Sequence, residues 1–182
     1  MKEQEKYLTS LSGDRRISKA HGRIVFRGLI DSLEADLIEA QVLASERNEK
    51  EICDKLGEVL DYLRNIMAAE VKETELKPPF LFGLDAKEIH WRSHHTGGFV
   101  LPSYTHGAVA ARINALRAKV REVELLAVRV FGEDPKPRDD IILALNRLSS
   151  ALWWLFCSFI SGSGEKPDND KNDYIIIGPG DR

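Results

Sequence analysis

Two arginines and a glutamate recur at helical spacing in residues 110–129. Arg117, Arg121 and Glu124 stand at positions i, i+4 and i+7, so a helix would place them along one polar stripe that borders its apolar face. One interpretation is an ion-pair ladder, because Arg121 and Glu124 are three residues apart, and for an isolated helix this is the more common case. The other interpretation is that these side chains line one side of an anion-binding site.

A basic loop containing a glycine lies near the start of the chain. Residues 9–19 read TSLSGDRRISK and combine hydroxyl groups, Gly13 and three basic side chains. Loop amides can approach a phosphate closely, and guanidinium groups bond phosphate oxygens in pairs. There is no Walker A sequence, which excludes a P-loop enzyme. The loop and the arginine stripe together indicate binding of ATP or another polyphosphate, whereas the alternative for the loop is a frayed terminus.

Two further polar positions accompany this pair of features. Arg27 and Asp31 are four residues apart on the next predicted helix, and Asn146 with Arg147 lies early in the last one. As a surface pair, Arg27 and Asp31 would contribute only about 0.3–0.5 kcal/mol.

Four histidines follow in the middle of the chain. His90 and His94 have the i, i+4 spacing of two zinc ligands on a helix, with His95 and His106 beyond them. No cysteine or third ligand stands near them in the sequence. We therefore favour histidines that contact substrate or solvent over a zinc site.

Apolar periodicity predicts helices over residues 21–45, 49–71, 110–131 and 141–160. Residues 72–104 form a long connection, within which Asp85 and Glu88 resemble a capping box that would start a short helix ending near residue 92. The predicted fold is an all-α, up-and-down bundle of four to five helices in the ferritin-like topology class, with one long inter-helix loop. We divide the chain into a nucleotide-binding loop (1–20), a helical-bundle domain (21–162) and a polar tail (163–182) with a short docking patch at 174–177.

Composition limits the partners. The 182 residues suffice for one domain, and a net charge of −3 gives no overall field that would recruit nucleic acid or an anionic membrane. Two cysteines without a CxxC motif and a polar start without a signal sequence predict a cytoplasmic protein with reduced thiols. The apolar run 151–160 is about half the ~20 residues of a membrane span, which favours a buried bundle helix.

Four segments resemble the corrinoid adenosyltransferases of the propanediol-utilization type. TSLSGDRRISK (9–19) is similar to that family's TSLxGGxRVSK, and residues 23–31 follow in the register of its first helix. Residues 117–124 resemble its RxxxRxxE helix, and residues 146–149 its NRLSD motif. The stretches HGRIVFRGLIDSLEADLIEAQ, SHHTGGFVLPSY and ALNRLSSALWWLFC look most like the ethanolamine-utilization branch.

The resemblance implies a helical-bundle enzyme that moves the 5′-deoxyadenosyl group of ATP onto the cobalt of cob(I)alamin and releases triphosphate. Reduced cobalt is itself the nucleophile, so the protein's tasks are positioning and stabilisation of the leaving polyphosphate. The implied ligands are ATP, Mg²⁺ and cobalamin. A homo-oligomer, such as a trimer with sites shared between subunits, and a transfer of adenosylcobalamin to ethanolamine ammonia-lyase are also implied.

The resemblance also assigns roles to residues. Arg121 would bind phosphate, Glu124 and Asn146 would fix the nucleotide and its Mg²⁺, and Asp31 would pair with Arg117 across a subunit interface. Phe99 starts an FVLP segment similar to the family's FxLPGG, whose aromatic ring would press on the lower face of the corrinoid and exclude an axial ligand. The remaining nucleotide-binding residues would be Thr9, Ser10, Gly13, Arg16, Ser18, Lys19 and Arg27.

The sequence departs from the family pattern in three places. The TKTGD segment upstream of TSL is not found in the eight residues before Thr9, Ser103-Tyr104 replaces Gly-Gly, and the Cys-Cys-x-x-His metal motif of some ethanolamine-type relatives is absent. We therefore expect no structural transition metal.

Two alternatives remain open. The first departure motivates a non-catalytic protein that binds or carries a corrinoid. A helical nucleotide pyrophosphatase would need several ExxE pairs for Mg²⁺, and Glu70 with Glu73 has no acidic partner pair on a later core helix, so this alternative ranks last.

Overall fold

The computed structural model describes residues 6–13, 15–96, 100–132 and 137–162. Its main elements are helices, as the apolar periodicity predicted. They are α1 (Gly22–Glu46), α2 (Lys50–Lys72), the short α3 (Ala86–His95), α4 (Gly107–Phe131) and α5 (Asp139–Gly162). A single 3₁₀ turn, Tyr104–His106, precedes α4.

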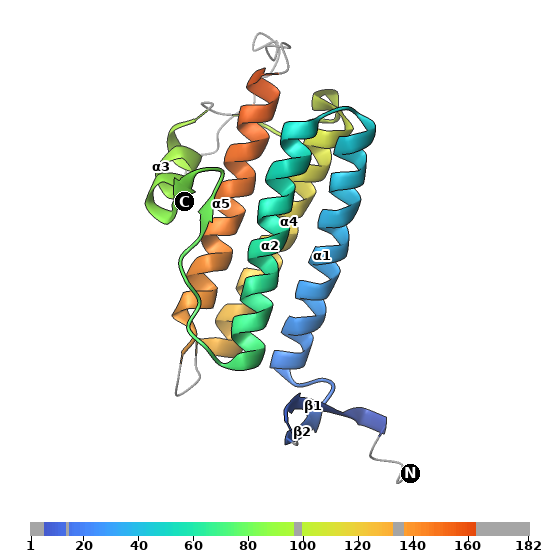
Figure 1. Ribbon diagram of the computed structural model, residues 1–182, viewed down its shortest axis with the longest axis vertical. Coiled ribbons are helices and arrows are strands. Elements are labelled where there is room, and N and C mark those ends of the chain that lie inside the picture. Colours follow the sequence, from blue (N-terminus) through green and yellow to red (C-terminus); the bar gives the residue numbers. More distant parts are fainter. Residues whose placement is uncertain (1–5, 14, 97–99, 133–136, 163–182) are drawn as a thin grey trace, which may run out of the picture.

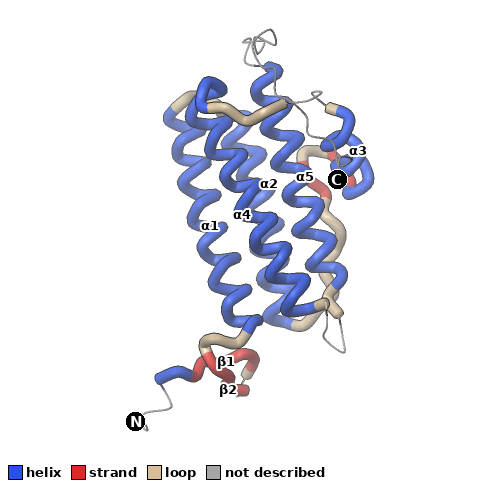
Figure 2. Tube along the Cα trace, turned by 180° about the vertical axis from the view of Figure 1, so that it is seen from behind, coloured by secondary structure: helices blue, strands red, loops and turns tan. Residues whose placement is uncertain are grey.

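The four long helices form a bundle in which α1 contacts α2 and α4, and α5 packs on α4 and α2. In Figure 1, α1 and α5 run upward whereas α2 and α4 run downward, so α2 and α4 are parallel. A crossover between them therefore has to travel the length of the bundle, and α3 lies on this crossover, against α5 (Figures 1 and 2). One long crossover in a four-helix bundle is the ferritin-like arrangement, which confirms the predicted fold.

Each long helix turns one apolar stripe inward. On α1 this stripe includes Phe26, Ile30, Leu33 and Leu37, at the three- and four-residue spacing of a helix face. Leu29 has the same spacing as Leu33 and Leu37, but its side chain is 38% exposed, and Phe26 lies in the core instead. The ring of Phe26 meets that of Phe131 edge to face at 5.0 Å, which closes the lower end of the core.

Helix α5 is long and apolar enough, by length and composition alone, to cross a membrane. Its burial is nevertheless that of a core helix, since Leu145, Leu148, Leu152 and Leu155 are all inaccessible inside the bundle. This agrees with the interpretation of its apolar run as a buried bundle helix.

The prediction of a loop before α1 was wrong. Strands β1 (Leu8–Ser12) and β2 (Arg15–Ser18) pair antiparallel, with Thr9 opposite Ile17 and an irregularity between Ser10 and Ser12. Gly13 turns the chain with φ +51°, a conformation that glycine adopts without steric cost. The strands are short and mostly polar, so they lack the alternation from which strands are recognised. A second, two-residue pairing joins β3 (Phe80–Leu81) to β4 (Leu84–Asp85).

The crossover is held to the bundle by polar contacts. Asp140 accepts a hydrogen bond from the amide of Leu76 at 2.9 Å, and Arg138 donates to the carbonyl of Thr74 at 2.9 Å. The predicted capping box is present at Asp85 and Glu88, and it starts α3, which continues three residues beyond the predicted end.

Candidate functional site

A pocket of about 370 Å³ opens where α3, α4 and α5 meet. The structure brings two of the predicted residues, Arg117 and Arg121, to its wall, opposite His94 of α3. Its other lining residues are Ser93, Pro102, Ser149, Ser150 and Trp153. Two cations together with hydroxyl groups and an aromatic ring make a site suited to an anion attached to a planar group.

Arg117 is held rigidly in this wall. Its Nε donates to the Oδ1 of Asn114 at 3.0 Å, and its guanidinium lies over the ring of Trp153 at 5.3 Å from the centroid. Burial and the neighbouring charge of Arg121 lower the pKa of Arg117 below its ordinary value, so the two guanidinium groups repel each other. An anion placed between the two would relieve this repulsion.

Arg121 does not form the ion-pair ladder with Glu124. It is exposed, and it makes no hydrogen bond or ion pair with any other residue in the described part of the chain. Its donors are therefore available to a ligand.

Glu124 is tied to α5 instead. Its Oε1 accepts a hydrogen bond from the Nδ2 of Asn146 at 2.9 Å, while the Oδ1 of Asn146 accepts one from Arg147 at 2.5 Å. The amide of Asn146 is thus oriented by a carboxylate on one side and a guanidinium on the other. The remaining carboxylate oxygen of Glu124 is the kind of ligand that Mg²⁺ prefers.

The predicted phosphate loop lies elsewhere in the chain. The β1–β2 hairpin sits below the start of α1, whereas α3 lies toward the other end of the bundle (Figures 1 and 2), and none of the described hairpin residues lines the pocket. Within the hairpin Ser10 Oγ donates to the carbonyl of Gly13 at 2.6 Å, and Ser18 Oγ accepts from the amide of Ala20 at 3.1 Å. Arg16 reaches the carbonyl of Leu8 at 3.4 Å, while Thr9 and Lys19 have no side-chain hydrogen bond to another described residue.

Asp31 is exposed on α1 and contacts neither Arg117 nor Arg27 among the described residues. A single chain therefore forms neither the surface pair nor the pair with Arg117.

Residues 1–159 match the model of the cobalamin adenosyltransferase family. The chain belongs to this family. It is 35% identical over 153 residues to the corrinoid adenosyltransferase EutT of Salmonella typhimurium, and 33% identical to EutT of Escherichia coli K12. Both matches cover 80% of this chain but 56% of the relative, so the chain spans a little over half the length of these proteins. Both relatives agree with the resemblance to the ethanolamine-utilization branch.

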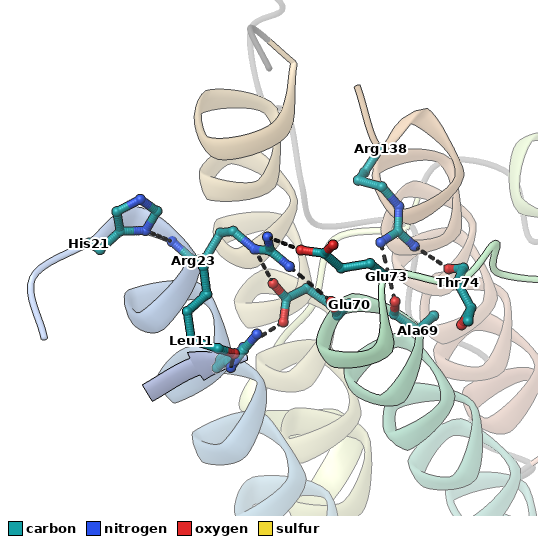
Figure 3. A network of polar contacts seen from close by, with 9 residues as sticks. Leu11, His21, Arg23, Ala69, Glu70, Glu73, Thr74 and Arg138 are labelled. Carbon is teal, nitrogen blue, oxygen red and sulfur yellow. Dashed lines mark hydrogen bonds and ion pairs between the residues drawn. The ribbon is translucent and has the colours of Figure 1, made fainter. Parts of the chain in front are cut away.

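Sequence reasoning missed a buried network at the base of this adenosyltransferase-family bundle (Figure 3). Glu70, in the last turn of α2, is 0% exposed and accepts hydrogen bonds from Arg23 and Arg27 of α1, each at 2.5 Å. The sequence analysis considered Glu70 only as one half of an ExxE pair with Glu73. A signal was present, because Glu70 follows Leu63 and Ile66 on the buried stripe, and a carboxylate there needs a cationic partner.

The histidines of α3 lie beside the pocket without forming a metal site. The described residues contain no group of three His, Cys, Asp or Glu side chains able to hold a metal ion. His94 Nδ1 bonds the carbonyl of His90 at 2.9 Å, and His95 stacks on Trp91 at 4.6 Å. The charge of Arg147, followed by burial and the other histidines, lowers the pKa of His90 below 6.5, so His90 is neutral near pH 7.

Two predictions fall outside the described residues. They are the placement of Phe99 below the corrinoid and the docking patch at 174–177.

Proposed function

We propose that this chain transfers the 5′-deoxyadenosyl group of ATP to cob(I)alamin, giving adenosylcobalamin and triphosphate in support of ethanolamine utilization. The observation that carries the proposal is the pocket wall of Arg117 and Arg121 beside the Glu124–Asn146 pair, in a member of the cobalamin adenosyltransferase family. The EutT relatives, which are corrinoid adenosyltransferases by name, support it.

In the reaction, cobalt(I) of the corrinoid substrate supplies an electron pair to the 5′ carbon of ATP. The bond between cobalt and carbon forms as the bond between C5′ and oxygen breaks, and triphosphate leaves with that second electron pair. Negative charge grows on the leaving oxygen, so preorganised donors at that point lower the barrier. Arg121 offers free donors there, and Arg117 is already fixed by Asn114 and Trp153.

Mg²⁺ fits this arrangement, because one oxygen of Glu124 is taken by Asn146 and the other remains for a cation held mainly by nucleotide phosphates. The bound cation would neutralise phosphate charge. Asn146 and Arg147 keep the carboxylate of Glu124 in place for this purpose.

The complete site is shared between copies of the chain. None of the described hairpin residues, which include Arg16, Ser18 and Lys19, lines the pocket that holds Arg121, and Asp31 has no partner among the described residues. In a symmetric homo-oligomer, proposed as a trimer, the hairpin of one copy meets the arginine wall of the next, and Asp31 pairs with Arg117 across the interface. The enzyme works in the cytoplasm and hands adenosylcobalamin to an enzyme that depends on it.

Two substitutions in the candidate site test this proposal, Arg121 in the pocket and Glu124 beside it. With chemically reduced cob(I)alamin and MgATP under anaerobic conditions, Arg121→Ala and Glu124→Ala should each lower kcat/KM by about 10²- to 10³-fold, the usual loss for one preorganised group. Arg129→Ala and Glu122→Ala remove the same groups from exposed positions on α4 and should behave as wild type. Wild-type rates in both Arg121→Ala and Glu124→Ala would contradict the assignment.

A further inference from the structure

We propose that Glu70 and Arg27 are positioning residues that fix the β1–β2 hairpin on the base of the bundle and thereby set the affinity for ATP. The effect on ATP rests on the proposed function, in which the hairpin binds phosphate. The mechanical part does not depend on it.

The first observation is the symmetry of the contacts to Glu70 (Figure 3). Its Oε1 accepts from Arg23 Nε and its Oε2 from Arg27 Nε, both at 2.5 Å, so one carboxylate joins two arginines that are four residues apart on α1. Arg23 also bonds the carbonyl of Glu70 at 3.0 Å and the side chain of Glu73 at 2.7 Å. Burial alone would lower the pKa of Arg23, but these hydrogen bonds outweigh it and raise that pKa.

The second observation is the bond from this network to the hairpin. Arg27 Nη1 donates to the carbonyl of Leu11 at 2.8 Å, and among the hairpin residues whose burial is described Leu11 is the one whose side chain joins the buried set, at 2% exposed. Leu11 lies in β1, within residues 9–19. Arg27 therefore connects α2 to the segment that the proposed function assigns to phosphate.

Arg27 is mostly buried, with 16% of its side chain exposed. Its Nε bonds Glu70, its Nη1 bonds Leu11, and its Nη2 is buried without a hydrogen-bond partner among the described residues. We had assigned Arg27 to direct contact with the nucleotide. With two nitrogens bonded inside the protein and the third buried, it acts through the hairpin instead.

The negative charge of Glu70 is what holds the two guanidinium groups together. Without it the two guanidinium groups would have only the Glu73 carboxylate, which bonds Arg23, to offset their charges, and separation would relieve the repulsion. When Arg27 moves, the carbonyl of Leu11 loses its partner and its place under the bundle. The four-helix core lies above this point, so the hairpin loosens while the bundle stays folded.

The test uses three variants of the full chain. Glu70→Gln removes the charge at constant shape, and Arg27→Lys keeps a charge beside Glu70 but loses the second arm that reaches Leu11. Glu51→Gln is the matched control, because it breaks only an exposed pair with Lys55 at the opposite end of α2. Amide hydrogen exchange is measured without ligand, followed by ATP Kd, ATP KM, corrinoid KM and kcat.

We expect amides of residues 8–18 to exchange about tenfold faster or more in both network variants, while amides of α4 keep their protection. ATP Kd and KM should rise about tenfold, with kcat and corrinoid KM changed less than about threefold. Glu51→Gln should match wild type throughout.

Unchanged exchange of the hairpin in Arg27→Lys would overturn the proposal, whether or not the protein transfers adenosyl groups. Faster exchange with an unchanged ATP Kd would overturn the link to ATP. If wild type binds ATP without turnover, the proposed function fails, whereas exchange and Kd still decide this inference.

Discussion

At the residue scale, Asn146 connects α4 and α5, the two helices that supply the polar residues of the candidate site. Its Nδ2 donates to Glu124 of α4 at 2.9 Å, and its Oδ1 accepts from Arg147 of α5. An amide side chain donates from its nitrogen and accepts at its oxygen, so it can join a carboxylate to a guanidinium. Replacing the amide of Asn146 with a carboxylate keeps the shape of the side chain but puts an acceptor oxygen where the donor Nδ2 was.

Asn146→Asp should therefore lower kcat/KM for MgATP about tenfold or more, because two carboxylates would meet where a hydrogen bond stood. Asn65→Asp makes the same change at an exposed position of α2 and should have no effect. The anaerobic transfer assay measures both. An Asn146→Asp enzyme as active as wild type would mean that the pair does not shape the site.

Residue spacing predicted most side chains of the candidate site, but it did not predict the buried network around Glu70. Arg117, Arg121 and Glu124 were found because helical periodicity places them on one stripe, and Asn146 because of the motif around it. Glu70 was missed because a sequence shows a charge without showing its burial. Which cation a buried carboxylate contacts depends on how α1 and α2 pack. Arg27 and Glu70 are 43 residues apart in the sequence, so their contact cannot be read from local spacing.

At the element scale, the crossover from α2 to α3 depends on one carboxylate at the start of α5. Burial would raise the pKa of Asp140, but hydrogen bonds from Arg138 and from the amide of Leu76 outweigh it and hold the pKa below its usual 3.8. A carboxyl with a depressed pKa stabilises the folded state above its unfolded pKa. That contribution is lost as the pH falls through the folded pKa.

Asp140→Asn should reduce the free energy of unfolding by about 1–3 kcal/mol at pH 7, because a charged acceptor becomes neutral. The difference in the free energy of unfolding between Asp140→Asn and wild type should stay constant from pH 5 to 8. It should shrink below about pH 4, where the carboxyl of Asp140 in wild type protonates. Urea unfolding at pH 7 and pH 3 measures it, with Asp54→Asn as an exposed control on α2. Equal differences at both pH values would contradict the role of the charge.

Helices and hairpin differ in how far the sequence predicts them. A helix of 23 to 25 residues repeats its apolar pattern several times, so α1, α2 and α4 were predicted within about three residues at each end. The hairpin has five- and four-residue strands and one buried side chain, Leu11, which is too little pattern to recognise. It depends on Gly13 and on its contacts with the bundle.

At the scale of the whole molecule, the parts of the proposed site lie apart in one chain. The hairpin is at the base of the bundle (Figure 1), and none of its described residues lines the pocket that holds Arg117 and Arg121. A second copy can bring a hairpin to this wall. The pair between Asp31 and Arg117 would then form only in the oligomer, so reversing the charges tests it.

Asp31→Arg and Arg117→Asp should each weaken assembly, because like charges would meet at the interface, whereas the double variant should assemble as wild type does. Sedimentation velocity measures assembly independently of activity, and wild type should sediment as a trimer. Asp61→Arg, on an exposed position of α2, serves as the control. Single variants that sediment like wild type would place Asp31 and Arg117 outside the interface.

The transfer reaction itself is the most direct test of the account. Purified wild-type protein is mixed anaerobically with chemically reduced cob(I)alamin and MgATP, while the cobalt(I) absorption band and the released phosphates are followed. The account predicts loss of the band, formation of light-sensitive adenosylcobalamin and an equal amount of triphosphate. Corrinoid that stays bound and unalkylated in the presence of ATP would contradict it and would favour a carrier protein.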